Sequence, residues 1–211
     1  MTLQIETIVT SPFDTNCYVL RSNGHCWVVD VGILPGPLAK FLHSESAEPS
    51  RLLLTHGHAD HTAGVNKLRK VFPDALVTCP AGDENMLSDS KANMSGPFGI
   101  FMGKIHADEV IEPGLTLKLG TLDWHVLDTS GHTPGGVSYY CPSQEVVISG
   151  DALFAGTVGR TDLPGASAGR LLRNIRRELM TLPEVTRVLP GHGPETTIGQ
   201  EKRSNPFFKN D

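Results

Sequence analysis

The sequence has no apolar run close to the roughly 20 residues that a membrane-spanning helix needs, and its first residues lack the basic and apolar regions of a signal peptide. It also lacks an excess of basic charge, because 18 Lys and Arg are set against 23 Asp and Glu, for a formal net charge of −5. Nucleic acids and anionic membranes favour basic surfaces. We therefore expect a cytoplasmic protein that binds neither nucleic acid nor membrane.

Cysteine is scarce and its spacing is uninformative for disulfides. The chain has four cysteines, namely Cys17, Cys26, Cys79 and Cys141. They form no C-x-x-C pair and no disulfide framework. A hairpin closed at Asn23-Gly24 would place Cys26 opposite Arg21, so Cys26 should not bond to Cys17. We predict four reduced thiols that are buried as small apolar groups.

The length and the pattern of elements indicate one α/β domain over residues 1–211. A chain of 211 residues can bury about 70% of its unfolded surface without staples. Expected strands and helices alternate, separated by many of the 22 Gly and 15 Pro. We expect strands at 2–10, on both sides of Asn23-Gly24, and at 51–55, 75–79, 116–119, 124–128, 137–141, 146–149 and 186–190. Helices are predicted at 61–72 and, capped by Ser167, at 167–181.

Two segments carry further information. In the predicted hairpin, Tyr18 and Leu20 point to one face and Val19 to the other, which is typical of a strand covered on both sides. Residues 82–107 contain few β-branched side chains but several Met and Phe. We interpret this second segment as a cover whose apolar side chains either join the core or line a pocket, with Lys91 or Lys104 available to meet a carboxylate.

The most informative feature is a set of His and Asp residues at the ends of four separate apolar strands. The stretches "LLLTHGH", "HVLDTSGH", "VVISGD" and "RVLPGH" each run from a strand into His or Asp, mostly through Gly. Strand ends that share one edge are where α/β folds place their chemistry. The candidate ligands, together with the two that follow the first stretch, are His56, His58, Asp60, His61, His132, Asp151 and His192.

Five imidazoles and two carboxylates suit divalent metal ions, and zinc is expected, although iron and manganese accept the same ligands. Seven ligands are too many for one tetrahedral ion. They fit two ions if one carboxylate and one solvent molecule bridge them, an arrangement that yields a bridging hydroxide as nucleophile near neutral pH.

The motif H-x-H-x-D-H at 56–61, followed by Gly131-His132, Gly150-Asp151 and Gly191-His192, resembles the metallo-β-lactamase superfamily. That resemblance implies an αββα sandwich of two similar halves. It also implies that His56, His58 and His132 hold the first metal, that Asp60, His61 and His192 hold the second, and that Asp151 bridges. Asp60 and Asp151 are accordingly the candidate catalytic carboxylates. The other histidines match no position of the family.

Residues 149–165 and 191–207 are similar to the short glyoxalase-II-like hydrolases, which cleave S-lactoylglutathione to lactate and glutathione. A thioester also suits this site chemically, because a thiolate leaves without a placed acid. The small-molecule substrate is therefore predicted to be a thioester or ester. Arg160, Thr161 and Asp162 are candidates to support the loop of Asp151, and Asp30 is a candidate to support the ligands.

Other functions share these residues. A persulfide dioxygenase would use one iron held by His56, His132 and Asp151, and it would consume oxygen. A lactonase would share all seven ligands. A β-lactamase proper is disfavoured by the bridging Asp151. A non-enzymatic metal-binding module is disfavoured because none of the four cysteines, common ligands of structural zinc sites, lies in the cluster.

Overall fold

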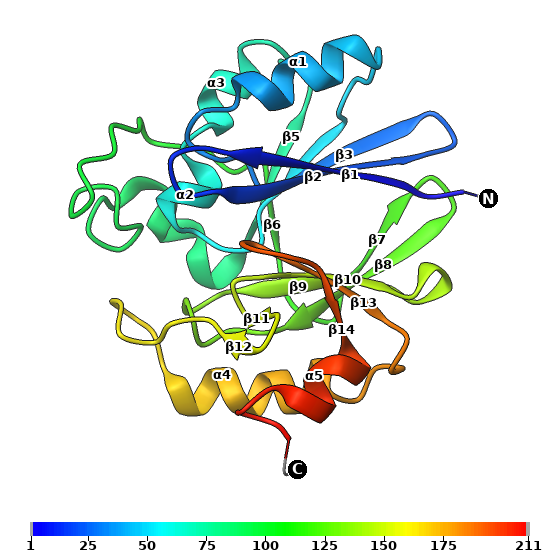
Figure 1. Cartoon of the computed structure of the whole chain (residues 1–211). Helices are drawn as coiled ribbons and strands as arrows, with labels where there is room; N and C mark the ends of the chain where they lie inside the picture. The colour runs from blue at the N-terminus through cyan, green and yellow to red at the C-terminus, as the bar shows by residue number, and fades with distance from the viewer. Residues whose placement is uncertain (1, 210–211) are drawn as a thin grey trace.

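Two six-stranded β-sheets stack face to face, and helices cover the outer face of each sheet (Figure 1). The computed structural model describes residues 2–209. The N-terminal half of the chain builds one sheet and the C-terminal half builds the other, so the structure has the predicted αββα architecture.

The N-terminal sheet has the strand order β1-β2-β3-β4-β5-β6. Its first three strands are antiparallel, and β3 to β6 run parallel. The strands are β1 (Gln4–Thr10), β2 (Thr15–Ser22), β3 (His25–Val29), β4 (Arg51–Leu53), β5 (Leu76–Pro80) and β6 (Glu109–Ile111). The helices of this half are α1 (Gly36–Ser44), α2 (Ala59–Thr62), α3 (Val65–Arg69) and a 3₁₀ helix at Ala81–Ser88.

The C-terminal sheet has the order β14-β13-β10-β9-β8-β7, and only β10 and β13 pair in parallel. Its strands are β7 (Thr116–Leu119), β8 (Leu122–Asp128), β9 (Val137–Cys141), β10 (Val146–Gly150), β13 (Arg187–Pro190) and β14 (Thr196–Thr197). A separate short hairpin joins β11 (Leu153–Phe154) to β12 (Thr157–Val158). The remaining helices are α4 (Ala168–Asn174), a π-helical turn (Ile175–Leu179), α5 (Ile198–Ser204) and a 3₁₀ turn (Pro142–Gln144).

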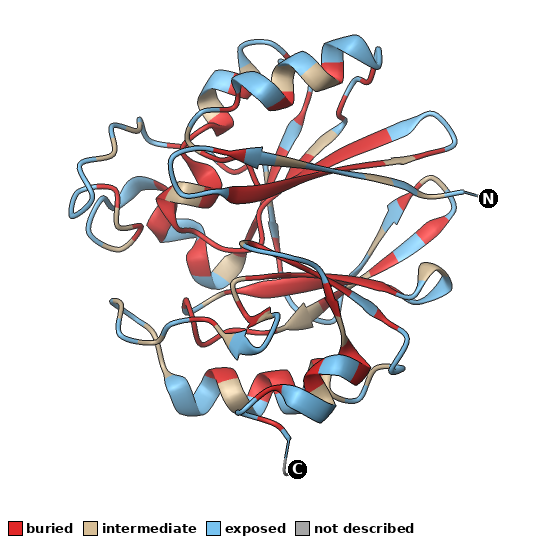
Figure 2. Ribbon diagram, in the orientation of Figure 1, coloured by how far each residue is buried: buried red, intermediate tan, exposed pale blue. Residues whose placement is uncertain are grey.

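Apolar side chains form three layers of core, one between the sheets and one beneath each set of helices. Figure 2 shows that much of the central strands is buried, whereas the outer sides of the helices are exposed. The β2–β3 hairpin shows why. Leu20 and Trp27 pack between the sheets, whereas Val19 and Val28 pack under the helices of the N-terminal half. The expectation of a hairpin covered on both faces is therefore confirmed, and its register pairs Arg21 with Cys26 as predicted.

Most of the expected elements are present, with two differences in the helices. The helix predicted at 61–72 is divided at Gly64 into α2 and α3. The helix predicted at 167–181 begins as expected, with the Ser167 hydroxyl accepting a hydrogen bond from the Arg170 N–H, but it passes into a π-helical turn after Asn174. The helices α1 and α5 were not predicted. All four cysteines are free and buried, as expected, and no helix within residues 2–209 is long and apolar enough to cross a membrane.

Candidate metal centre

The candidate ligands are delivered by loops that follow four strands. The loop after β4 runs into α2 and carries the H-x-H-x-D-H segment, while His132 follows β8, Asp151 follows β10 and His192 follows β13. The loops from the two halves are joined by main-chain contacts. The Val137 N–H donates to the Thr55 carbonyl at 2.9 Å and the Asn16 N–H donates to the Gly191 carbonyl at 2.8 Å. These contacts bring ligands from both sheets to one place.

His56, His58 and His132 form the first group. One ring nitrogen from each lies within 4.8 Å of the others, and all three residues are buried. His58 Nδ1 is only 2.9 Å from His132 Nε2. Three converging imidazoles are a common ligand set for a divalent cation.

Asp60, His61 and His192 form the second group, again with potential ligand atoms within 4.8 Å of one another. His192 Nε2 lies 3.1 Å from His61 Nε2 and 3.2 Å from Asp60 Oδ2. His61 is fully buried, whereas His192 and Asp60 are partly exposed. This second group therefore faces outward more than the first.

Asp151 lies between the two groups. Its Oδ1 is 3.3 Å from His61 Nε2, and its Oδ2 is 3.6 Å from both His132 Nε2 and His192 Nε2. One carboxylate thus approaches histidines of both groups, which is the position that a bridging ligand would occupy.

Burial and mutual proximity shape the charges of these side chains. Burial, assisted by the neighbouring His61, lowers the pKa of His56 well below its usual value, and burial beside His132 lowers that of His58 to about 3. Burial alone would raise the pKa of Asp151, but His61 outweighs it and holds that pKa well below its usual value. His56 and His58 are therefore neutral imidazoles, the form that binds a divalent cation. Burial alone would lower the pKa values of His61 and His192, but Asp151 and Asp60 outweigh it, so both pKa values are instead raised.

Three atoms of the candidate ligands lack hydrogen-bond partners, which tests whether a cation fits. Among the described residues, His56 Nε2, His58 Nε2 and Asp151 Oδ1 are buried and make no hydrogen bond. Buried polar atoms are usually satisfied. Since nitrogen and carboxylate oxygen are good ligands for zinc, iron and manganese, the residues present fit a metal at this position.

The far sides of the rings are held by hydrogen bonds that aim the other nitrogen into the cluster. His61 Nδ1 lies 2.8 Å from Asp30 Oδ2, His132 Nδ1 lies 2.8 Å from the Arg160 carbonyl, and His192 Nδ1 lies 3.0 Å from the Phe13 carbonyl. Asp30 also accepts bonds from the Thr55 N–H and hydroxyl, each at 2.8 Å. Asp30 therefore orients His61, which agrees with its predicted supporting position.

The prediction that the side chains of Arg160 and Asp162 support the loop of Asp151 needs correction. The side chains of Arg160 and Asp162 bind each other at 2.7 and 2.8 Å and are more than half exposed, so they do not brace the loop of Asp151. Support comes instead from the Arg160 main-chain carbonyl, and the ligand that it supports is His132.

Sequence reasoning missed Asp83, which connects the loops of the first group. This fully buried carboxylate accepts the Gly57 N–H at 2.9 Å through Oδ2 and the Gly135 N–H at 2.6 Å through Oδ1. Burial raises the pKa of Asp83 despite these hydrogen bonds. A signal was present, because Asp83 also follows an apolar strand through Gly, as the ligands do.

Close packing explains why glycine is required at two of the positions that precede the ligands. Gly191 approaches the centre so closely that a Cβ there would lie 2.2 Å from Asp151 Oδ1 and 2.7 Å from His61 Cε1. Gly131 has a φ of +138°, and its Cβ would lie 2.3 Å from the Leu171 nitrogen in α4. The recurrent Gly before His or Asp thus reflects tight packing of the ligand loops.

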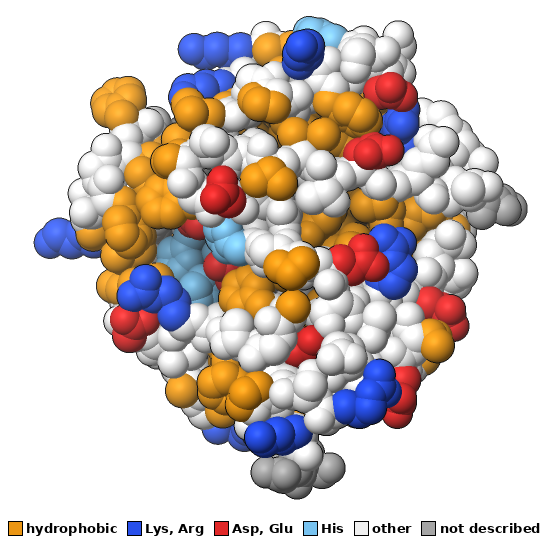
Figure 3. Space-filling view, viewed as in Figure 1, with side chains coloured by type: hydrophobic (Ala, Val, Ile, Leu, Met, Phe, Trp, Pro, Cys, Tyr) orange, Lys and Arg blue, Asp and Glu red, His pale blue; other side chains and the backbone are white. Residues whose placement is uncertain are grey.

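A pocket of about 220 Å³ opens onto the cluster. Histidines lie in a hollow on the face shown in Figure 3, with hydrophobic side chains gathered beside it. The predicted cover contributes in part: Met94, Phe98 and Ile100 line the pocket, whereas Met102 packs against the core. Neither Lys91 nor Lys104 is among the lining residues. The remaining lining residues are Phe13, His58, Ala59, Asp60, Asn93, His132, Asp151, Arg160, Leu163 and His192.

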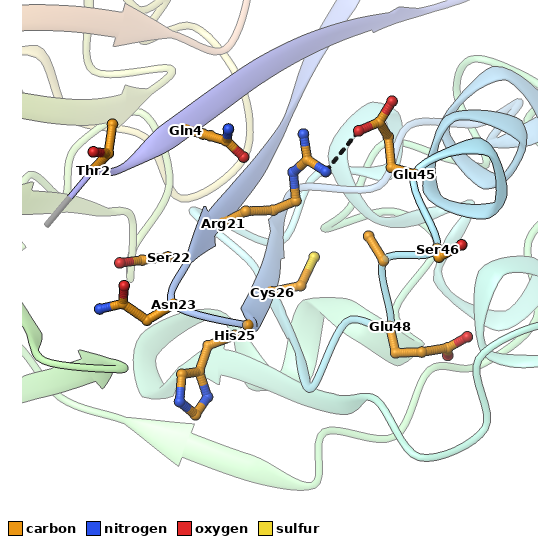
Figure 4. A pocket seen from close by; sticks show the side chains of 12 residues that line it. Thr2, Gln4, Arg21, Ser22, Asn23, His25, Cys26, Glu45, Ser46 and Glu48 are labelled. Carbon is orange, nitrogen blue, oxygen red and sulfur yellow. Dashed lines mark hydrogen bonds and ion pairs between the residues drawn. The ribbon is translucent and has the colours of Figure 1, made fainter.

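A larger hollow of about 560 Å³ lies at the turn of the β2–β3 hairpin, away from the cluster (Figure 4). Its Arg21 is paired with Glu45 at 2.8 Å, and it contains none of the seven candidate ligands. The groups of potential metal ligands found within residues 2–209 lie elsewhere. The smaller pocket is therefore the candidate site.

The fold and this arrangement define a class. The family model of the metallo-beta-lactamase superfamily matches residues 10–192, and the chain belongs to this superfamily. It is similar to a protein of Bacillus subtilis named probable metallo-hydrolase YqgX, with 40% identity over 198 residues and 93% of each chain covered. It is also similar to hydroxyacylglutathione hydrolase GloC of Haemophilus influenzae, with 32% identity over 209 residues and 98% of each chain covered.

Solved structures agree with this assignment. The B3 metallo-beta-lactamase BLEG-1 superposes with a TM-score of 0.92 at 37% identity, over 97% of this chain and 99% of that one. TTHA1623 in a di-iron-bound form superposes with a TM-score of 0.87 at 34% identity, over 96% of this chain and all of that one. The chain is thus a probable metallo-hydrolase of this superfamily.

Proposed function

We propose that the seven residues hold two divalent cations and that the chain hydrolyses thioesters to a hydroxy acid and a thiol. His56, His58 and His132 would hold the first cation, and Asp60, His61 and His192 the second, with Asp151 shared. When bound, the cations supply Lewis acidity toward a carbonyl oxygen and activate solvent as the nucleophile. Zinc suits these ligands. Iron is an equally good candidate, because the similar protein TTHA1623 has been solved in a di-iron-bound form.

The single observation that carries the proposal is the position of Asp151. It lies 3.3 to 3.6 Å from histidines of both groups, as a shared ligand must. The other residues orient this arrangement: Asp30 fixes the ring of His61, and main-chain carbonyls fix the rings of His132 and His192.

The choice of a thioester rests on the leaving group. An amine or an alkoxide needs a positioned acid, whereas a thiolate departs near neutral pH without one. Burial raises the pKa of Asp60, but His61 and His192 outweigh it and lower that pKa below its usual value. Because Asp60 and Asp151 are both held ionised, neither is suited to protonate a leaving group. The likeness to GloC supports the same substrate class.

The test combines elemental analysis of the purified protein with hydrolysis of S-lactoylglutathione. Two metal equivalents with turnover are expected. One iron without turnover, together with oxygen consumption in the presence of a persulfide, would favour a persulfide dioxygenase that uses His56, His132 and Asp151. A lactone and a β-lactam belong in the same panel, the latter because of the relative BLEG-1. Faster turnover of either than of the thioester would replace the proposed substrate.

A further inference from the structure

The pocket over the metal centre has an apolar wall built from three separate segments. Phe13 comes from the β1–β2 turn, Met94, Phe98 and Ile100 come from the predicted cover, and Leu163 comes from the loop before α4. Phe13 and Phe98 meet edge to face, with ring centroids 5.6 Å apart. The wall is tied to the ligands, because the Phe13 carbonyl lies 3.0 Å from His192 Nδ1 and the Asn93 carbonyl accepts the Ala59 N–H at 2.8 Å.

The polar side chains that line this pocket, apart from the candidate ligands, are already engaged. The Asn93 amide donates to the Met86 carbonyl at 2.7 Å and accepts the Ser95 N–H at 2.9 Å. Arg160 directs its Nε and Nη2 to Asp162. Among the described residues that line the pocket, Arg160 is the sole Lys or Arg. The neighbouring Asp162 carboxylate balances its charge. The wall therefore offers little to a carboxylate or peptide group.

The size of the pocket sets the size of its occupant. An apolar cavity of about 150 Å³ is enough to hold benzene. This pocket, at about 220 Å³, exceeds that volume and opens directly onto His58, Asp60 and Asp151. An apolar group as large as a phenyl ring can therefore lie against Phe13 and Phe98 while the bond next to it reaches the metal centre.

We propose that this pocket selects substrates with an apolar group of about phenyl size beside the scissile bond. This inference rests on the proposed hydrolysis of thioesters. The group is attached either to the carbonyl carbon or to the sulfur. Burying it against the wall supplies binding energy that a methyl group cannot. The small lactoyl group of S-lactoylglutathione would then be a poor match, and aryl or branched acyl thioesters would be preferred.

Matched substrates test this preference with the metal-loaded protein. S-mandeloylglutathione and S-lactoylglutathione share the thiol and differ by phenyl against methyl on the acyl side. The lactoyl thioesters of benzyl mercaptan and ethanethiol make the same comparison on the sulfur side. Each rate is divided by the rate of uncatalysed alkaline hydrolysis, which removes intrinsic reactivity. We expect kcat/KM to favour the aryl member by about tenfold in one arm, and that arm identifies the side on which the group lies.

Two variants connect the preference to the wall. Phe98→Ala removes a half-exposed ring that lines the pocket, and it should lower the aryl-to-methyl ratio several-fold. Phe101→Ala is the matched control, because Phe101 lies in the same segment, is 97% exposed and does not line the pocket. Its ratio should equal that of the unmodified protein.

The outcomes separate the two proposals. Turnover of all four thioesters with no aryl preference in either arm, or an equal loss of preference in both variants, overturns the inference and leaves thioester hydrolysis intact. Failure of the two-metal protein to hydrolyse any of them overturns the proposed function, and the inference with it.

Discussion

Asp151 is surrounded by three histidines that belong to both groups of the centre. Replacing it with Asn keeps its shape and removes its charge. We expect Asp151→Asn to retain about one metal equivalent in place of two and to lose at least about 100-fold in kcat/KM, because an amide is a poor bridging ligand. Elemental analysis and steady-state hydrolysis measure both effects.

The control for this variant is Asp123→Asn, which removes an exposed carboxylate paired with Lys118 far from the centre. It should keep both metals and full activity. A fully active Asp151→Asn protein that retains two metals would show that Asp151 does not bridge.

A second residue, Asp83, holds the ligand loops in place by accepting hydrogen bonds from main-chain N–H groups. In Asp83→Asn an NH₂ group must replace one of the two acceptors that face Gly57 and Gly135. We expect about 2 kcal/mol lower stability and metal affinity reduced by about 10- to 100-fold. Urea unfolding and competition with a chromogenic chelator measure the two. The control is Glu84→Gln at the exposed neighbouring position, which should change neither the stability nor the metal affinity. Unchanged metal affinity in Asp83→Asn would show that Asp83 does not position the ligand loops.

The contrast between these residues explains what the sequence could reveal about the site. The convergence of the seven candidate ligands was predictable because metal binding requires particular side chains in a recognisable order, and the structure brings all seven together. Their binding of metal stays a prediction. Asp83 follows an apolar strand through Gly as the ligands do, but it matches no position of the metal-binding motif. Its partners are main-chain N–H groups, which the residue types do not reveal. Arg160 was identified as a supporting residue, but the supporting atom is its carbonyl oxygen rather than its guanidinium.

Among the secondary-structure elements, the sequence predicts turns and helix starts correctly where specific turn or cap residues are present. The Asn23-Gly24 turn and the Ser167 cap were both predicted, and both are present. The division at Gly64 was not predicted, because it depends on close packing: a Cβ there would lie 2.1 Å from the Gly32 carbonyl oxygen. For α5 a signal existed but was overlooked, since the Thr197 hydroxyl accepts the Gln200 N–H at the helix start, in a T-x-x-Q sequence typical of a capping box.

The end of β8 is tied to the π-helical turn after α4 through Asp128. Its Oδ2 accepts a hydrogen bond from Arg177 at 3.0 Å, and its Oδ1 accepts bonds from Ser130 and Asn174, each at 3.1 Å. Burial raises the pKa of Asp128, but the bonds from Ser130 and Arg177 outweigh it, so the pKa falls below its usual 3.8. These bonds hold together two elements on either side of the His132 loop.

This lowered pKa predicts a pH-dependent contribution to stability. The stabilisation is present above the unfolded value of 3.8 and is lost as the pH falls through the lower folded value. Asp128→Asn should therefore be about 1 kcal/mol less stable than the unmodified protein at neutral pH, a figure kept small because solvent screens this partly exposed group, and the difference should shrink as the pH falls below 3.8. Denaturant unfolding at several pH values measures it; a difference that grows on acidification would contradict the prediction.

At the scale of the whole molecule, each group of the centre combines both halves. His56 and His58 come from the N-terminal half and His132 from the C-terminal half, and the second group is divided in the same way. Bound cations would therefore cross-link the two sheets. Ligand binding at 100 times Kd adds about 3 kcal/mol of stability, so chelation should lower Tm and added zinc should restore it.

Calorimetry with parallel metal analysis checks this effect. If a chelator removes the metal completely and Tm does not change, the cations do not connect the two halves.

The layered architecture was predictable in outline, because apolar residues on both faces of the hairpin require cover on both sides. The pairing of the two sheets was implied by the family resemblance rather than by any local pattern. Contacts such as the bond from the Tyr139 hydroxyl to the Leu54 carbonyl at 2.7 Å join residues 85 positions apart. Periodicity along the chain carries no information on such distant partners.

The order of the ligands along the chain also bears on how the protein is made. During synthesis from the N-terminus, the segment 56–61 emerges from the ribosome before the other ligands. The first group stays incomplete until residue 132 has followed, and the second until residue 192 has followed. Between the synthesis of residue 61 and that of residue 192, a nascent chain therefore presents only partial, weakly chelating ligand sets. If the proposed two-cation centre forms, its full ligand set becomes available only after residue 192 has been synthesised.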